Sequence, residues 1–144
     1  MALLLALALA LAPAALAGKG SGGGGGGGGG HRGTSYTGSF VGANPVLVTD
    51  ANGNGAPNYG DQITFSVTSN ATYYDVELDC SQSGAVVFQQ IVGFGLGWAW
   101  SQTYTLKSGA WASGAASCTA VLFASNADGS NRQNLASRSF SVGA

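Results

Sequence analysis

Charge is what this chain has least of. Only 8% of its 144 residues are charged, with Lys and Arg together numbering 5 and Asp and Glu together 6, and it has a single histidine. A coiled coil needs charged residues beside its apolar seam, and a nucleic-acid-binding protein needs a basic stripe. The composition therefore argues against both classes, and no nucleic-acid partner is expected. The length suits one domain rather than two.

The first 33 residues differ in composition from the rest. Residues 3–11 are an unbroken run of Leu and Ala, and Ala15-Leu16-Ala17 is the small-x-small pattern that precedes a signal cleavage site. We predict a signal peptide over residues 1–17, although the basic residue that usually opens such a signal is missing. The alternative is an amphipathic or buried helix. The apolar run is too short for a stable membrane span.

Residues 18–33 are dominated by glycine, with nine consecutive glycines at residues 22–30. Glycine has no side chain to bury and loses more backbone entropy on folding than any other residue. We therefore predict a flexible linker between the signal peptide and a folded domain at residues 34–144. Because the only histidine, His31, lies in this linker, we do not expect it to be catalytic.

Residues 34–144 are rich in Val, Thr, Ser, Phe and Tyr, with frequent turn residues and no convincing helical period. Alternation of apolar and polar residues predicts half-buried strands. The expected strands are residues 45–49, 62–68, 74–81, 85–92, 101–107, 116–124 and 135–142. About seven short strands predict an all-β fold, an immunoglobulin-like (Ig-like) antiparallel β-sandwich.

The sequence has two cysteines, Cys80 at the end of one predicted strand and Cys118 near the start of another. Antiparallel neighbours in one sheet would bring these two strand ends together. In a secreted chain, two cysteines most simply form one disulfide. Two free, buried thiols are the alternative.

Residues 50–61 are rich in Asp, Asn and Gly. Counted from Asp50, oxygen-bearing side chains occupy positions 1, 3, 5, 9 and 12, and Gly55 occupies position 6. This spacing resembles the calcium loop of EF-hands and of bacterial dockerin-type repeats. The resemblance implies calcium as a cofactor, held by Asp50, Asn52, Asn54, the Ala56 carbonyl, Asn58 and Asp61.

Such a calcium site would bind weakly. With only two carboxylates among its ligands, its dissociation constant should be on the order of 10⁻⁴ to 10⁻³ M, as in extracellular modules. The alternative is a metal-free turn, because Asn and Gly also close tight connections between strands.

Four aromatic residues are candidates for ligand contact. Trp98 and Trp100 share an alternating face, and core packing is the alternative for both. Phe94 and Trp111 fall in predicted loops and are expected to be more exposed. Exposed coplanar rings would form a surface for stacking on sugars.

We predict that the protein is not an enzyme. Asp75, Glu77 and Asp79 share one face of a predicted strand, at a spacing that overlaps that of glycosidase carboxylates. An outward row of three carboxylates is more simply a solvated stripe that discourages edge pairing. No Ser-His-Asp set is present, and a Cys-His pair is excluded if the cysteines are bonded to each other.

As a whole, residues 34–144 resemble a secreted bacterial Ig-like or fibronectin type III-like module. The resemblance implies a non-catalytic structural or adhesion domain, secreted or at the cell surface, in which calcium rigidifies a connection. Its partners would be extracellular proteins or polysaccharides. A carbohydrate-binding module and a self-assembling surface, fibre or virion subunit are the alternatives. Whether the protein forms a homo-oligomer is left open.

Overall fold

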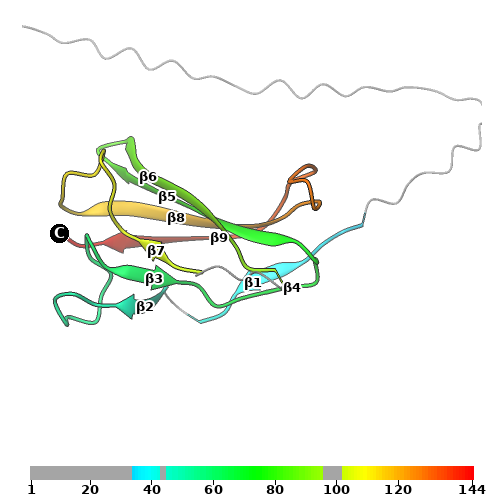
Figure 1. Cartoon of the computed structure of the whole chain (residues 1–144), viewed down its shortest axis with the longest axis horizontal. Coiled ribbons are helices and arrows are strands. Elements are labelled where there is room, and N and C mark those ends of the chain that lie inside the picture. Colours follow the sequence, from blue (N-terminus) through cyan, green and yellow to red (C-terminus); the bar gives the residue numbers. More distant parts are fainter. Residues whose placement is uncertain (1–33, 43–44, 96–101) are drawn as a thin grey trace, which may run out of the picture. The chain divides into compact units, whose positions relative to one another are not determined.

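The computed structural model describes residues 34–42, 45–95 and 102–144 (Figure 1). In this part of the chain every regular element is a strand, and all paired strands are antiparallel, which confirms the all-β prediction. The predicted signal peptide and linker lie outside the described residues. The strands are β1 Gly38–Phe40, β2 Val46–Thr49, β3 Gln62–Thr64, β4 Val67–Ser69, β5 Tyr74–Gln82, β6 Ala85–Gly93, β7 Tyr104–Thr105, β8 Ala116–Ala124 and β9 Gln133–Val142.

The four long strands form one sheet in the order β6-β5-β8-β9. Their alternation is the reason they can do so, because successive side chains of a strand point to opposite faces. In β5, Val76, Leu78 and Cys80 are fully buried, whereas the acidic residues between them are only half-buried. The sidedness predicted for this strand is confirmed.

The shorter strands depart from the prediction. The alternating stretch at residues 62–68 is divided between β3, which pairs with β2 and β7, and β4, which pairs with β1. The N–H of Val41 donates to the carbonyl of Ser66 at 2.8 Å, beside the change of partner. The strand expected at residues 101–107 is reduced to Tyr104–Thr105 among the described residues. Periodicity indicates which side chains face inward, but it does not tell which strand supplies the hydrogen bonds.

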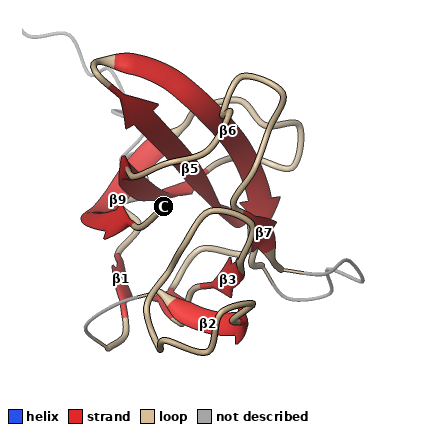
Figure 2. Ribbon diagram, turned by 90° about the vertical axis from the view of Figure 1, so that its left-hand side faces the viewer, coloured by secondary structure: helices blue, strands red, loops and turns tan. Residues whose placement is uncertain are grey.

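The core lies between the long sheet and the shorter strands. Figure 2 shows β5 and β6 in one layer and β2 and β3 in the other. Phe65 packs edge-on against the rings of Phe40, Tyr104 and Phe140, with centroids 5.4, 5.6 and 6.1 Å away. The Tyr104 hydroxyl donates to the Val76 carbonyl at 2.7 Å and so links the two layers. Burial raises the pKa of this phenol far above its ordinary value.

The predicted disulfide is confirmed. Cys80 of β5 and Cys118 of β8 are direct register partners, and their sulfur atoms are bonded at 2.01 Å. Both side chains are buried in the core. The bond lies within one sheet, and it therefore reinforces the central strand pair rather than joining the two layers.

Candidate functional site

The segment of residues 50–61 connects β2 to β3 and is closed by its own hydrogen bonds. One oxygen of the Asp50 carboxylate accepts the N–H of Gly53 at 2.8 Å, and the other accepts the N–H of Gly55 at 2.7 Å. Both glycines have φ near +70° to +77°, a backbone conformation that side-chain-bearing residues rarely adopt. The glycines thus allow the chain to curl around the carboxylate.

Asparagine side chains continue this pattern along the loop. The Asn52 side-chain oxygen accepts the N–H of Asn54 at 3.1 Å, and the Asn54 side-chain oxygen accepts the N–H of Ala56 at 2.8 Å. The side-chain amide of Asn58 donates to the Asn54 side-chain oxygen at 3.0 Å and to the Ala56 carbonyl at 2.5 Å. Each of the three side-chain amides therefore binds the backbone two residues away, as Asn does in turns.

Asp61 anchors the loop to the core. Its side chain is only 1% exposed, and its two carboxylate oxygens accept the N–H of Ala51 at 2.9 Å and the N–H of Asn58 at 2.8 Å. Its backbone carbonyl accepts the N–H of Leu106 at 2.8 Å, just after β7. One buried carboxylate thus holds both ends of the loop in place.

These hydrogen bonds engage several of the oxygens that were predicted to bind calcium. The predicted ligands lie in one loop, and all are oxygens, which suit calcium better than zinc or copper. The four side-chain oxygen acceptors of Asp50 and Asp61 already bind backbone N–H groups, although each keeps a second lone pair. No group of three or more His, Cys, Asp or Glu side chains in the described residues could hold a metal ion. Calcium binding stays a prediction.

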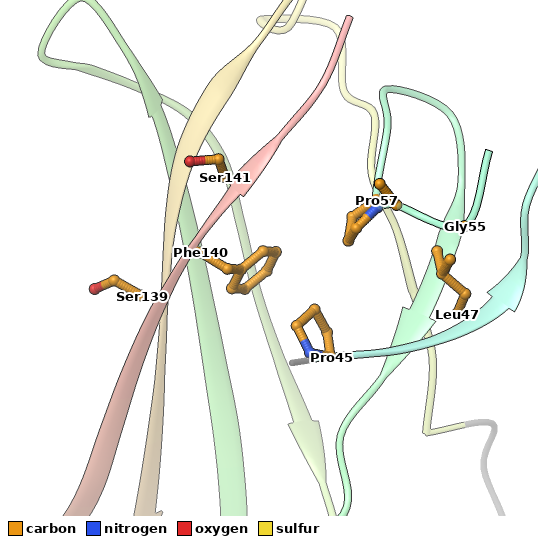
Figure 3. Close-up of a pocket in the computed structure, with 8 residues that line it drawn as sticks. Pro45, Leu47, Gly55, Pro57, Ser139, Phe140 and Ser141 are labelled. Carbon is orange, nitrogen blue, oxygen red and sulfur yellow. The ribbon is translucent and has the colours of Figure 1, made fainter. Parts of the chain in front are cut away.

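A groove of about 480 Å³ lies between this loop, β2 and β9 (Figure 3). The larger apolar side chains that line it are those of Pro45, Leu47, Pro57 and Phe140, which the close-up labels. The remaining described residues that line it are Gly55, Ala56, Ser139 and Ser141. None of these eight residues is charged, so the groove offers no charged side chain to hold an ion.

One edge of the four-stranded sheet is formed by β6, which pairs only with β5 among the described strands. The N–H of Phe94 donates to the carbonyl of Tyr74, on the β5 side. Because the backbone groups of a strand point alternately to its two sides, those of Gln89 and Ile91 point away from β5. The Ser108 hydroxyl donates to the Val87 carbonyl on this same outer side. The edge at Val87 is therefore already in contact with the segment after β7, and the backbone around Gln89 and Ile91 is the part of β6 that can accept another strand.

The side chains of β6 carry no charge, and two large apolar ones are exposed. Val86 and Ile91 are 63% and 53% exposed. Natural proteins often protect such an edge with lysine or proline, and neither residue lies in β6, although its register with β5 shifts by one residue at Val87. The sequence indicated a strand here, but only the sheet order reveals that it lies at an edge.

The predicted exposure of Phe94 and Trp111 is wrong. Trp111 is fully buried, and Phe94 is 7% exposed. The indole N–H of Trp111 donates to the Gly114 carbonyl at 3.1 Å, and its ring meets those of Tyr59 and Phe88 edge-on. The connection between β7 and β8 folds back over the core and carries Trp111 inward. Trp98 and Trp100 lie outside the described residues.

The row of carboxylates on β5 faces outward as predicted, but it is less solvated than expected. Arg132 pairs with Glu77 at 2.6 Å, and its guanidinium lies 3.8 Å from the centre of the Phe123 ring. Burial raises the pKa of Asp75, while the charge of Arg132 opposes this rise. One oxygen of Asp79 is buried without a hydrogen-bond partner in the described structure. Sequence reasoning missed Arg132, because it precedes β9 and nothing local indicates that it reaches across to β5.

Comparison of the chain with protein-family models, with curated proteins and with solved structures finds no match. Within the described residues, no helix is long and apolar enough to cross a membrane. The loop, the groove and the outer edge of β6 are the features of the described residues that bear on function.

Proposed function

We propose that residues 34–144 form a non-catalytic extracellular structural or adhesion domain that joins other proteins through the open edge of β6. The observation that carries this proposal is the edge itself, which belongs to a nine-residue uncharged strand and exposes the apolar side chains of Val86 and Ile91. An extended segment of a partner can add to such an edge as a further strand. Main-chain hydrogen bonds would then supply affinity, and the exposed side chains would supply selectivity.

Two other features support an extracellular role. The buried Cys80–Cys118 disulfide suits an oxidising compartment, and the predicted signal peptide at residues 1–17 would deliver the chain there. We assign the domain to the Ig-like or fibronectin type III-like class on its antiparallel layers. Calcium, if bound at residues 50–61, would stiffen the connection between β2 and β3 and would supply no chemistry.

The adhesive role is tested by attaching the mature chain to beads and measuring their binding to one another and to immobilised extracellular proteins. Ile91→Lys places a charge on the open edge, whereas Ile91→Thr is the matched control because it keeps the β-branched shape without charge. Loss of binding for Ile91→Lys, with binding retained for Ile91→Thr, supports the proposal. Equal binding by all three proteins refutes it, as does no binding by the wild type.

The same edge favours a second function, that of a self-assembling surface, fibre or virion subunit. In an antiparallel pair of β6 strands centred on Gln90, Gln89 of one copy would face Ile91 of the other, on the same side of the joined sheet. No like charges would oppose each other. Sedimentation at several concentrations measures this directly: a growing dimer that Ile91→Lys abolishes supports it, and a strict monomer at all concentrations excludes it.

Carbohydrate binding has lost two of its four proposed residues, because Phe94 and Trp111 are buried. It would now depend on Trp98 and Trp100. Retention on insoluble polysaccharide, abolished by Trp98→Ala or Trp100→Ala, would restore this function.

A further inference from the structure

We propose that Asn52 and Asn54 are sites of spontaneous deamidation, and that the Asp50 carboxylate controls how fast they react. These are the two asparagines of the sequence that are followed directly by glycine. Both lie in the exposed part of the loop between β2 and β3. Glycine has no side chain to obstruct attack by its own backbone nitrogen on the preceding side chain, so these two pairs are the most reactive in the chain.

The reaction needs only water. The backbone nitrogen of the glycine attacks Cγ of the asparagine, a new N–C bond forms, and the Cγ–Nδ2 bond breaks. The side-chain nitrogen leaves as ammonia, carrying the proton that the glycine nitrogen loses through solvent. Water then opens the five-membered succinimide at either carbonyl and yields aspartate or isoaspartate. The net change is asparagine plus water giving an acid plus ammonia.

Asp50 restrains both attacking nitrogens at once. The N–H groups of Gly53 and Gly55 donate to its two carboxylate oxygens at 2.8 and 2.7 Å. To react, each nitrogen must release its proton and turn toward the Cγ of the preceding asparagine. A hydrogen bond to a carboxylate holds that proton, and the nearby negative charge makes its removal more costly. Asp50 is therefore a protecting residue for both pairs.

The two asparagines are not held equally. The side-chain oxygen of Asn54 accepts two hydrogen bonds, from Ala56 and Asn58, at 2.8 and 3.0 Å. The side-chain oxygen of Asn52 accepts one, from Asn54, at 3.1 Å. Since both side chains must rotate to meet the attacking nitrogen, Asn52 should react first.

Reaction at Asn54 would have the larger structural effect. An isoaspartate there lengthens the main chain by one carbon and displaces the oxygen that Ala56 and Asn58 contact. Gly55, Ala56 and Pro57 line the groove beside β9, so the altered loop would change the groove. The proposal does not depend on the adhesive function, and its test has a separate readout.

The test incubates the full chain at 37 °C and mildly alkaline pH and follows the acid products by peptide mapping with mass spectrometry. Asp50→Asn removes the charge with little change in shape. Asp128→Ser is the matched control, because Asp128 also lies in an exposed turn and accepts the N–H of Ser130, away from this loop. Serine is used there because Gly129 follows, and asparagine at that position would add a third Asn-Gly pair. Asn52→Gln and Asn54→Gln, one at a time, assign each product.

We expect Asp50→Asn to speed deamidation about tenfold, the factor by which one hydrogen bond to a charged acceptor changes a local opening equilibrium. Asp128→Ser should match the wild type, and Asn52 should convert before Asn54. Thermal melting of each variant verifies folding, and amide hydrogen exchange at Gly53 and Gly55 should accelerate in Asp50→Asn even if the domain is destabilised. Unchanged exchange and unchanged deamidation in Asp50→Asn would overturn the protecting role of Asp50. No reaction at either asparagine in urea-unfolded protein would overturn the modification sites themselves.

Discussion

Replacing Asp61 by alanine tests whether the loop between β2 and β3 is held by hydrogen bonds to a buried carboxylate. The substitution removes the acceptor of two backbone N–H groups. Ala51 is exposed, so water can replace the lost bond there, but Asn58 is only 7% exposed, and its N–H would be left without a partner. A bond to a charged group contributes about 1.5–3 kcal/mol, and a stranded buried N–H costs about 1–3 kcal/mol.

Removal of the carboxylate also relieves the cost of keeping a charge at a site that is 1% exposed. With that offset, we expect Asp61→Ala to lower the free energy of unfolding by about 3 kcal/mol. Asp50→Ala is the matched comparison, because it also removes the acceptor of two N–H groups. Those belong to the exposed residues Gly53 and Gly55, so water replaces the lost bonds, and we expect a loss of about 1 kcal/mol or less.

Urea unfolding followed by tryptophan fluorescence measures both differences, first with a chelator and then with calcium. A loss below about 0.5 kcal/mol for Asp61→Ala in chelator would refute the reasoning, because a surface substitution would do as much. Calcium binding predicts a different pattern. Calcium at about ten times its dissociation constant should stabilise the wild type by about 1.4 kcal/mol, and both variants should lose this gain. Stability unaffected by millimolar calcium would exclude the site.

Three further predictions concern the core and the outer face of the long sheet. Replacing Cys80 and Cys118 by alanine opens a link between residues 38 apart in sequence and should cost about 4 kcal/mol in chemical unfolding; a cost near zero would mean that the unfolded chain is already restrained. Trp111→Ala should lower the free energy of unfolding by about 3–5 kcal/mol, and Trp111→Phe should lower it less, because the ring is fully buried and donates to Gly114. Equal losses for the two variants would mean that the buried volume of the ring does not determine the loss of stability. Burial raises the pKa of Asp75 above 3.8, so the native state holds its proton more tightly, and this residue makes stability fall as pH rises above 3.8. Asp75→Asn should flatten that part of the stability curve measured by urea unfolding, and an unchanged slope would contradict the assignment.

The long strands were predictable because the alternation of apolar and polar residues is visible within each strand's own sequence. In β5 and β8 the alternation is regular enough to place both strands within a residue or two and to assign the inward face. The disulfide followed from the same pattern, because Cys80 and Cys118 fall at ends that an antiparallel pair brings together. β1, only three residues long, has too few residues for a period to be recognised. The division of residues 62–68 between β3 and β4 depends on partners far away in the sequence.

The features of the candidate sites also differ in whether local sequence or distant partners determine them. The sequence by itself determined that residues 50–61 form an Asn- and Gly-rich connection, that Cys80 and Cys118 pair, and that β5 turns its acids outward. Tertiary structure alone decided that Trp111 is buried, that Arg132 reaches Glu77, and that β6 lies at an edge of its sheet among the described strands. The physical reason is that a two-residue period reports which face of a strand is apolar. The burial of a loop residue and the openness of an edge are set instead by which distant segments pack beside them.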